Sequence, residues 1–145
     1  MSYAAMHRGI NQYQKVGAYS SAAYADPHRL IQLLFDGLLD RVAQARGAME
    51  RGEVARKGEL IGKAIAILDG LRGALDHDRG GDIAGNLEEL YVYVQRRLVE
   101  ANVANDVVIL DECASLMREI KAAWEAIPPE VRNRKAAEAL AAREQ

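Results

Sequence analysis

Cysteine, excess basic charge and long apolar runs are scarce in this sequence, and each scarcity excludes a class of protein. The single cysteine, Cys113, rules out an intramolecular disulfide framework and fits a reducing compartment. Nineteen basic against 21 acidic residues give a formal charge of -2. This balance argues against nucleic acid as the main partner, because phosphate binding usually requires a basic stripe. No apolar run approaches the length of about 18 residues that spans a membrane. Residues 1–16 lack a signal-peptide layout, so we expect a cytoplasmic protein without membrane insertion.

Residues suited to catalysis or metal binding are also few. The histidines are His7, His28 and His77, and none follows a glutamate by three residues, which is the pattern of di-iron bundles. No His–Cys spacing indicates zinc, and Gly80-Gly81 lacks the Lys-Ser/Thr that completes a phosphate loop. Cys113 falls on an apolar stripe, which favours a buried structural thiol over a nucleophile. We therefore predict that the protein is not an enzyme and that it binds no cofactor and no metal.

Apolar residues are plentiful, at half of the 145 positions, and they recur with helical spacing. Asp26-Pro27 is a helix start signal, and Pro128-Pro129 is a stop. No useful stretch shows the period-two alternation of strands. The sequence therefore predicts an all-α protein, an antiparallel up-down four-helix bundle. The expected domain spans residues 26–127, between a mobile N-terminal arm (1–25) and a short C-terminal tail (128–145). Its helices are expected at residues 27–50, 54–76, 83–103 and 106–127, with residues 77–82 as a turn and Asp82 as the cap of the third helix.

The third expected helix has more apolar surface than one bundle face requires. Its main stripe includes Leu90, Tyr91 and Leu98, and a second stripe lies about a third of a turn away. Ordinary exposed apolar area explains the second stripe as well as a partner surface does. The second stripe is formed by Val92, Val99 and Val103.

The second expected helix has a row of small residues opposite its own apolar stripe. Each glycine inside a helix costs about 1 kcal/mol relative to alanine. A row without side chains lets another backbone approach closely, as small residues do between membrane helices. The alternative is that the row is simply solvated. This glycine ridge consists of Gly58, Gly62, Ala66, Gly70 and Gly73.

Several motifs, over residues 26–37 and residues 86–127, together resemble the flagellar secretion chaperone family FliS. Residues 26–37, DPHRLIQLLFDG, resemble the first-helix signature of the family. The similarity is strongest over residues 86–127, with LYVY, RRL, EAN and ND in the family's order and spacing. It covers about residues 10–127. The resemblance implies a cytoplasmic export chaperone that binds the disordered C-terminal segment of flagellin, prevents its premature polymerisation and delivers it to the flagellar export apparatus.

The resemblance and the surplus surfaces together select candidate site residues. Ile10 and Tyr13 match the Ile-x-x-Tyr pattern of the family's N-terminal arm, which is implicated in docking to a component of the export gate. A chaperone for a segment that folds on binding needs spare apolar grooves. A homodimeric structural bundle, or an adaptor with a different client, remains the alternative, and a weak homodimer of the free protein stays open. The candidate flagellin-binding residues are Gly62, Ala66, Tyr91, Val99, Asn102 and Val103.

Overall fold

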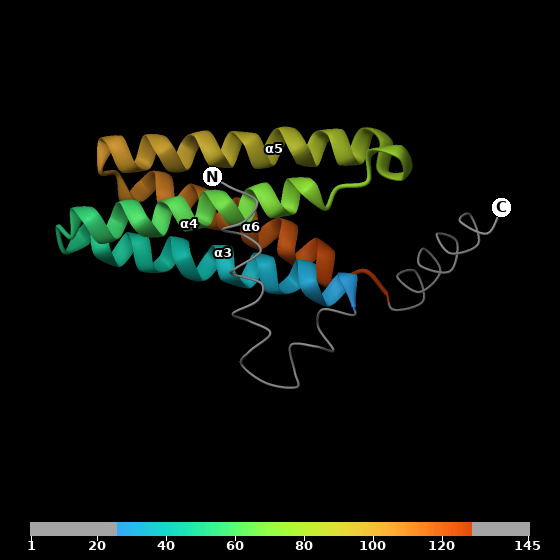
Figure 1. The fold of residues 1–145 in the computed structure, drawn as a ribbon, viewed down its shortest axis with the longest axis horizontal. Helices are drawn as coiled ribbons and strands as arrows, with labels where there is room; N and C mark the ends of the chain where they lie inside the picture. Colours follow the sequence, from blue (N-terminus) through green and yellow to red (C-terminus); the bar gives the residue numbers. More distant parts are fainter. Residues whose placement is uncertain (1–25, 129–145) are drawn as a thin grey trace.

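Four α-helices form the described part of the chain, residues 26–128, in the computed structural model (Figure 1). They are α3 (Pro27–Glu50), α4 (Val54–Gly73), α5 (His77–Ala104) and α6 (Val107–Glu125). Each helix packs on the next one in sequence, and α3 also packs on α6, which closes the ring. The predicted all-α up-down four-helix bundle is therefore confirmed. The predicted arm and all but the first residue of the predicted tail lie outside the described residues.

Aspartate side chains cap the start of three helices. The Asp26 carboxylate accepts from the His28 amide at 3.1 Å, so the predicted start of α3 is confirmed. Asp76 accepts from the Arg79 amide at 3.2 Å, at the start of α5. Asp106 caps α6 through the Val108 amide at 2.9 Å. Such caps stabilise a helix by about 1 kcal/mol each, because they satisfy amides that have no partner inside the helix.

The predicted turn over residues 77–82 is wrong, because this segment forms the first part of α5. Asp76, rather than Asp82, caps the helix, so the helix begins before the two glycines that suggested a turn. Gly81 has φ 50° and ψ -124°, which kinks the helix at a conformation that only glycine adopts readily. Because α5 begins earlier than predicted, α4 also ends earlier, at Gly73 rather than at residue 76. Separately, α6 ends at Glu125 rather than at residue 127.

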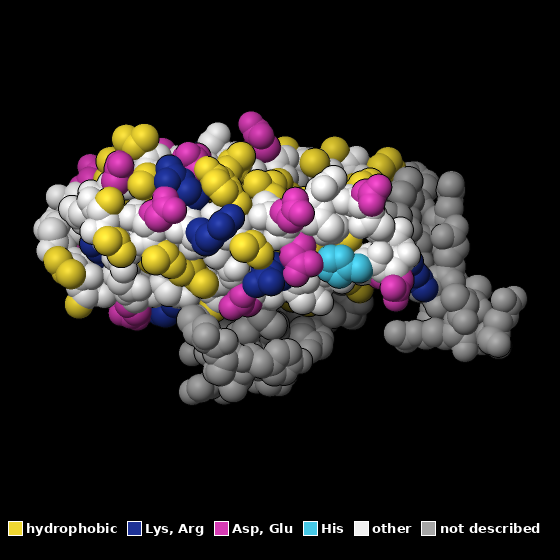
Figure 2. Space-filling model, turned by 90° about the horizontal axis from the view of Figure 1, so that it is seen from above, with side chains coloured by type: hydrophobic (Ala, Val, Ile, Leu, Met, Phe, Trp, Pro, Cys, Tyr) yellow, Lys and Arg dark blue, Asp and Glu magenta, His cyan; other side chains and the backbone are white. Residues whose placement is uncertain are grey.

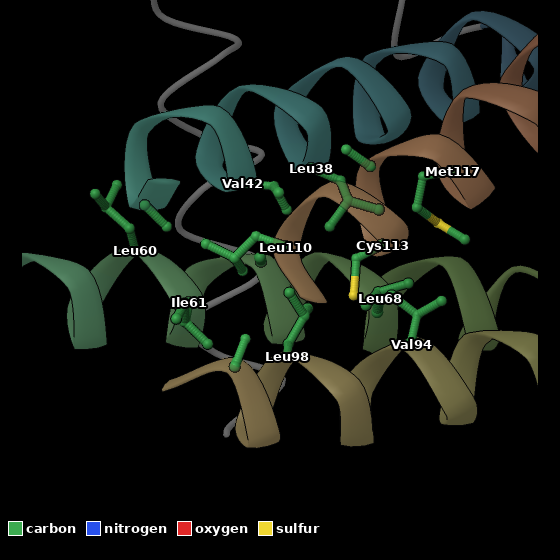
Figure 3. Packing of buried hydrophobic residues seen from close by; sticks show 14 of the residues in the cluster. Leu38, Val42, Leu60, Ile61, Leu68, Val94, Leu98, Leu110, Cys113 and Met117 are labelled. Carbon is green, nitrogen blue, oxygen red and sulfur yellow. The ribbon is translucent and has the colours of Figure 1, made fainter. Parts of the chain in front are cut away.

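All four helices contribute side chains to one hydrophobic core (Figure 3). Leu38, Leu98, Leu110 and Met117 are completely buried, so truncating any of them to alanine should cost about 2–5 kcal/mol. Cys113 points into the same core, and burial raises the pKa of its thiol to about 12. The thiol therefore stays protonated at neutral pH, which agrees with the predicted structural role.

Ion pairs on the periphery connect helices that are neighbours in space. Arg46 on α3 lies 2.7 Å from Asp111 on α6, and Lys121 on α6 lies 2.7 Å from Asp36 on α3. These side chains are partly exposed, so water screens each pair and its contribution to stability is small. The core therefore supplies most of the stability, while the ion pairs favour one pairing of helices.

Candidate functional site

Polar contacts fix α4 against α5 along the whole seam between the two helices. Near its middle, the Gln95 side-chain amide on α5 donates to Asp69 on α4 at 2.8 Å. Towards one end, the Lys57 ammonium on α4 donates to the Asn102 carbonyl of α5 at 3.0 Å. Because residue numbers rise along α4 as they fall along α5, the helices are antiparallel in a defined register. In this register Gly62 lies at the level of Val99.

The glycine ridge of α4 offers open space over only part of its length. A Cβ added at Gly58, Gly62 or Gly73 would meet no other atom of the described residues within 4 Å. Ala66 and Gly70 are buried, although Ala66 does not belong to the core cluster. A longer side chain is therefore accommodated more easily at Gly62 than at position 66.

The predicted site residues of α5 separate into exposed and buried positions. Val99 is 51% exposed and Val103 is 83% exposed, one turn apart on the same side of the helix. Asn102 is half-buried, and its backbone carbonyl accepts a hydrogen bond from Lys57 on α4. Tyr91 is only 3% exposed and belongs to the core, where burial raises the pKa of its hydroxyl to about 12. The structure therefore brings Val99, Asn102 and Val103 together but places Tyr91 beneath the surface.

We call the set Gly58, Gly62, Val99, Asn102 and Val103 the α4–α5 surface. It combines bare helix backbone on α4 with exposed valines on α5. Figure 2, which looks down on the bundle from the α5 side, shows hydrophobic side chains on that side of the molecule, with acidic and basic ones between them. Such a mixture suits an amphipathic helix, which needs apolar contacts on one side and polar groups at its edges.

Two further exposed valines lie at the end of the bundle where α5 finishes. Val54 is the first residue of α4 and is 71% exposed, and Val108 is the second residue of α6 and is 68% exposed. Figure 1 places the α3–α4 and α5–α6 turns at this same end. Sequence reasoning missed both residues, because a valine in the first turn of a helix has few periodic neighbours that could reveal its exposure.

A charged cluster holds α6 against the other side of α5. The Tyr93 hydroxyl donates to Glu112 at 2.7 Å, and the Arg97 guanidinium donates to the same carboxylate at 3.1 Å. The hydrogen bond from Arg97 lowers the pKa of the Glu112 carboxyl most, and the hydrogen bond from Tyr93 lowers it further. Arg97 also pairs with Glu100 on its own helix. The hydrogen bonds of this cluster join α5 to α6, so we assign it a structural role and do not include it in the candidate site.

Metal-binding and membrane-spanning features are both missing from residues 26–128. No group of three or more His, Cys, Asp or Glu side chains is placed to hold a metal ion there. Nor is any helix in that range long and apolar enough to cross a membrane. What the α4–α5 surface offers is apolar contact and backbone access. The other two predicted site residues, Ile10 and Tyr13, lie outside the described residues.

Comparisons with known proteins give a consistent family. A family model described as "Flagellar protein FliS" matches residues 9–131. The chain is 55% identical to the flagellar secretion chaperone FliSB of Pseudomonas aeruginosa, over 83% of this chain and 95% of that protein. It is 41% identical to the flagellar secretion chaperone FliS of Vibrio cholerae, over 92% and 98% of the two chains. It is 45% identical to the FliS of Salmonella typhimurium, over 83% and 90%.

Proposed function

This chain belongs to the FliS family of flagellar secretion chaperones, and on that premise we propose that it binds the C-terminal segment of flagellin in the cytoplasm. There it prevents premature polymerisation and delivers flagellin to the flagellar export apparatus. The family is one of chaperones rather than enzymes, as the sequence predicted. A flagellar secretion chaperone needs an export client, and flagellin is the client that we assign.

One observation supports this assignment most directly: Val99 and Val103 on α5 are exposed, and a Cβ added at Gly62 on the neighbouring helix α4 would meet no described atom within 4 Å. A client that is disordered when free gains its binding energy by forming a helix and burying its apolar face. Because ordering that helix costs free energy, the contact must be long to be tight. The α4–α5 surface follows the helix axes and so offers length in the required direction.

The test is a titration of the full chain with the C-terminal segment of the flagellin from the same organism. We expect a one-to-one complex, a gain of helix content by circular dichroism, and suppression of flagellin polymerisation by an equimolar amount of the protein. The matched control is the N-terminal segment of the same flagellin. Equal binding of both segments, or no binding of either, would contradict the proposal.

The same experiment separates the alternatives by mass. The chain has a mass of 15.9 kDa, so a chaperone should gain mass only when the client is added. A stable doubling of mass without client, together with no gain on adding flagellin, would indicate a homodimeric structural bundle. Binding to another flagellar protein but not to flagellin would indicate an adaptor.

Delivery requires a second contact, which we assign to Ile10 and Tyr13. The assignment is supported by the Ile-x-x-Tyr pattern and by the match of the family model from residue 9 onward. We propose that these two residues dock the loaded chaperone to a component of the export gate.

A further inference from the structure

Lys57, in the first turn of α4, is unusual for a charged residue because it is only 6% exposed. Lysine is almost never fully buried unless its charge has partners. The ammonium donates to the Asn102 carbonyl and to the Asn105 side-chain carbonyl, both at 3.0 Å. Both acceptors belong to the end of α5, so a lysine of one helix joins the start of α4 to the end of α5.

The contact supplies a hydrogen-bond donor to a backbone carbonyl at the C-terminal end of α5. The last four carbonyls of a helix have no partner within it. At this end the Asn105 and Asp106 amides both donate to the Ala101 carbonyl. Lys57 serves the next carbonyl, that of Asn102. A cation is also favoured there, because the C-terminal end of a helix carries partial negative charge.

We propose that Lys57 is a positioning residue that fixes the last turn of α5 and so sets how Asn102 and Val103 are presented to the client. Val103 is 83% exposed and lies directly after the residue whose carbonyl Lys57 holds. Without the lysine, the last turn of α5 frays and must be ordered when the client binds. This inference rests on the proposed function, and it assigns to client binding a residue that lies beneath the surface.

The test is Lys57→Met in the full chain, which keeps an unbranched side chain and removes the donor. Two measurements report on it: amide hydrogen exchange at residues 102–106, and affinity for the flagellin C-terminal segment. We expect exchange at these amides to be at least about tenfold faster, with the other half of α5 unchanged. We expect the affinity for the segment to be at least about fivefold weaker.

Two controls make the result specific. Lys63→Met removes the same charge from the same helix at a side chain that is 50% exposed, and it should change neither measurement. Val42→Ala removes buried methyl groups from α3, which is not part of the α4–α5 surface, and should lower stability without weakening affinity while the protein stays folded. The Val42→Ala variant separates a general loss of stability from local fraying of the last turn of α5.

Three outcomes would overturn the proposal: unchanged exchange at residues 102–106 in Lys57→Met, unchanged affinity despite faster exchange, or an equal loss of affinity in Val42→Ala. A wild-type chain that fails to bind the segment would instead contradict the proposed function. In that case the exchange measurement alone still decides whether Lys57 holds the end of α5.

Discussion

Asn105 ends α5 in the left-handed conformation, with φ 54° and ψ 47°, while its side chain accepts from Lys57. We expect Asn105→Ala to lose both features, at about 1–2 kcal/mol for the left-handed backbone and about 1 kcal/mol for the hydrogen bond. Asn105→Gly should lose only the second, because glycine adopts this conformation without strain. Urea denaturation of the two variants measures the difference. Equal losses would show that the backbone conformation contributes little.

The sequence predicts the contacts and burial of some residues but not of others. Asp26 was predicted as a cap, because capping depends on neighbours two and three positions away. The burial of Lys57 was not predicted, because its partners lie 45 and 48 residues further along the chain. Tyr91 was selected as a binding residue, yet its stripe position already matched the core. Local hydrogen bonds can therefore be predicted from sequence, whereas long-range polar contacts require the packed bundle.

At the scale of helices, the open part of the glycine ridge predicts the effect of Gly62→Leu. A Cβ at this position meets no other described atom within 4 Å, and leucine favours a helix more than glycine, so stability should rise by a few tenths to about 1 kcal/mol. If a client helix approaches the α4–α5 surface, the leucine should obstruct it and weaken affinity at least tenfold, or about 1.4 kcal/mol. Calorimetric titration and urea denaturation measure the two effects.

The matched control for this prediction is Gly73→Leu. Gly73 has the same open space on the same ridge, but it lies at the opposite end of α4 from the end of α5. This variant should keep its affinity for the segment. Unchanged affinity in Gly62→Leu would remove the ridge from the interface and leave the exposed valines of α5. The buried Ala66 is less suitable for such a test, because a larger side chain there changes packing as well as access.

The pairing of α5 with α6 should respond to acid through Glu112. Its pKa is lowered by hydrogen bonds from Arg97 and Tyr93, so the stabilisation is complete above the ordinary carboxyl pKa of about 4.3 and is lost as pH falls through the lower value of the folded protein. Glu112→Gln should therefore be less stable than the wild type at neutral pH, with the difference narrowing in acid. Thermal unfolding across this pH range measures the effect. Glu119→Gln, at an exposed carboxyl of the same helix, is the control, and an equal narrowing there would refute the assignment.

The sequence predicted that all four helices exist, but it did not predict where α5 starts. Apolar spacing along α3 and α6 predicts both helices, because each buries one continuous stripe. The start of α5 was mispredicted because Gly80 and Gly81 together are typical of a turn. Instead the Asp76 cap begins the helix and Gly81 absorbs the bend. A kink inside a helix leaves the same local sequence pattern as a turn between helices.

At the scale of the whole molecule, the arrangement of the bundle follows from helix lengths and short connections. Only Arg51–Glu53 separate α3 from α4, and Ala74–Asp76 separate α4 from α5, so successive helices must fold back on each other. The predicted up-down four-helix bundle is confirmed for this reason. Which face stays open could not be predicted in the same way. Exposure of Val99 and Val103 depends on how far α4 covers α5, and this is set by the register of side-chain contacts between them.

The last prediction separates two roles: client binding by the bundle, and docking to the export gate by residues that precede the bundle in the sequence. Ile10 and Tyr13 precede the predicted bundle domain, and all four helices of the described residues 26–128 supply side chains to the core. We therefore expect Ile10→Ala combined with Tyr13→Ala to leave the melting temperature and the affinity for flagellin nearly unchanged. If these residues dock the loaded chaperone to the export gate, secretion of flagellin by cells with this variant should fall severalfold. Gly62→Leu supplies the opposite pattern for comparison, with weakened client binding and an unchanged gate contact. Normal secretion by the double variant would remove the docking role, and a large fall in melting temperature would show that the two side chains stabilise the bundle instead.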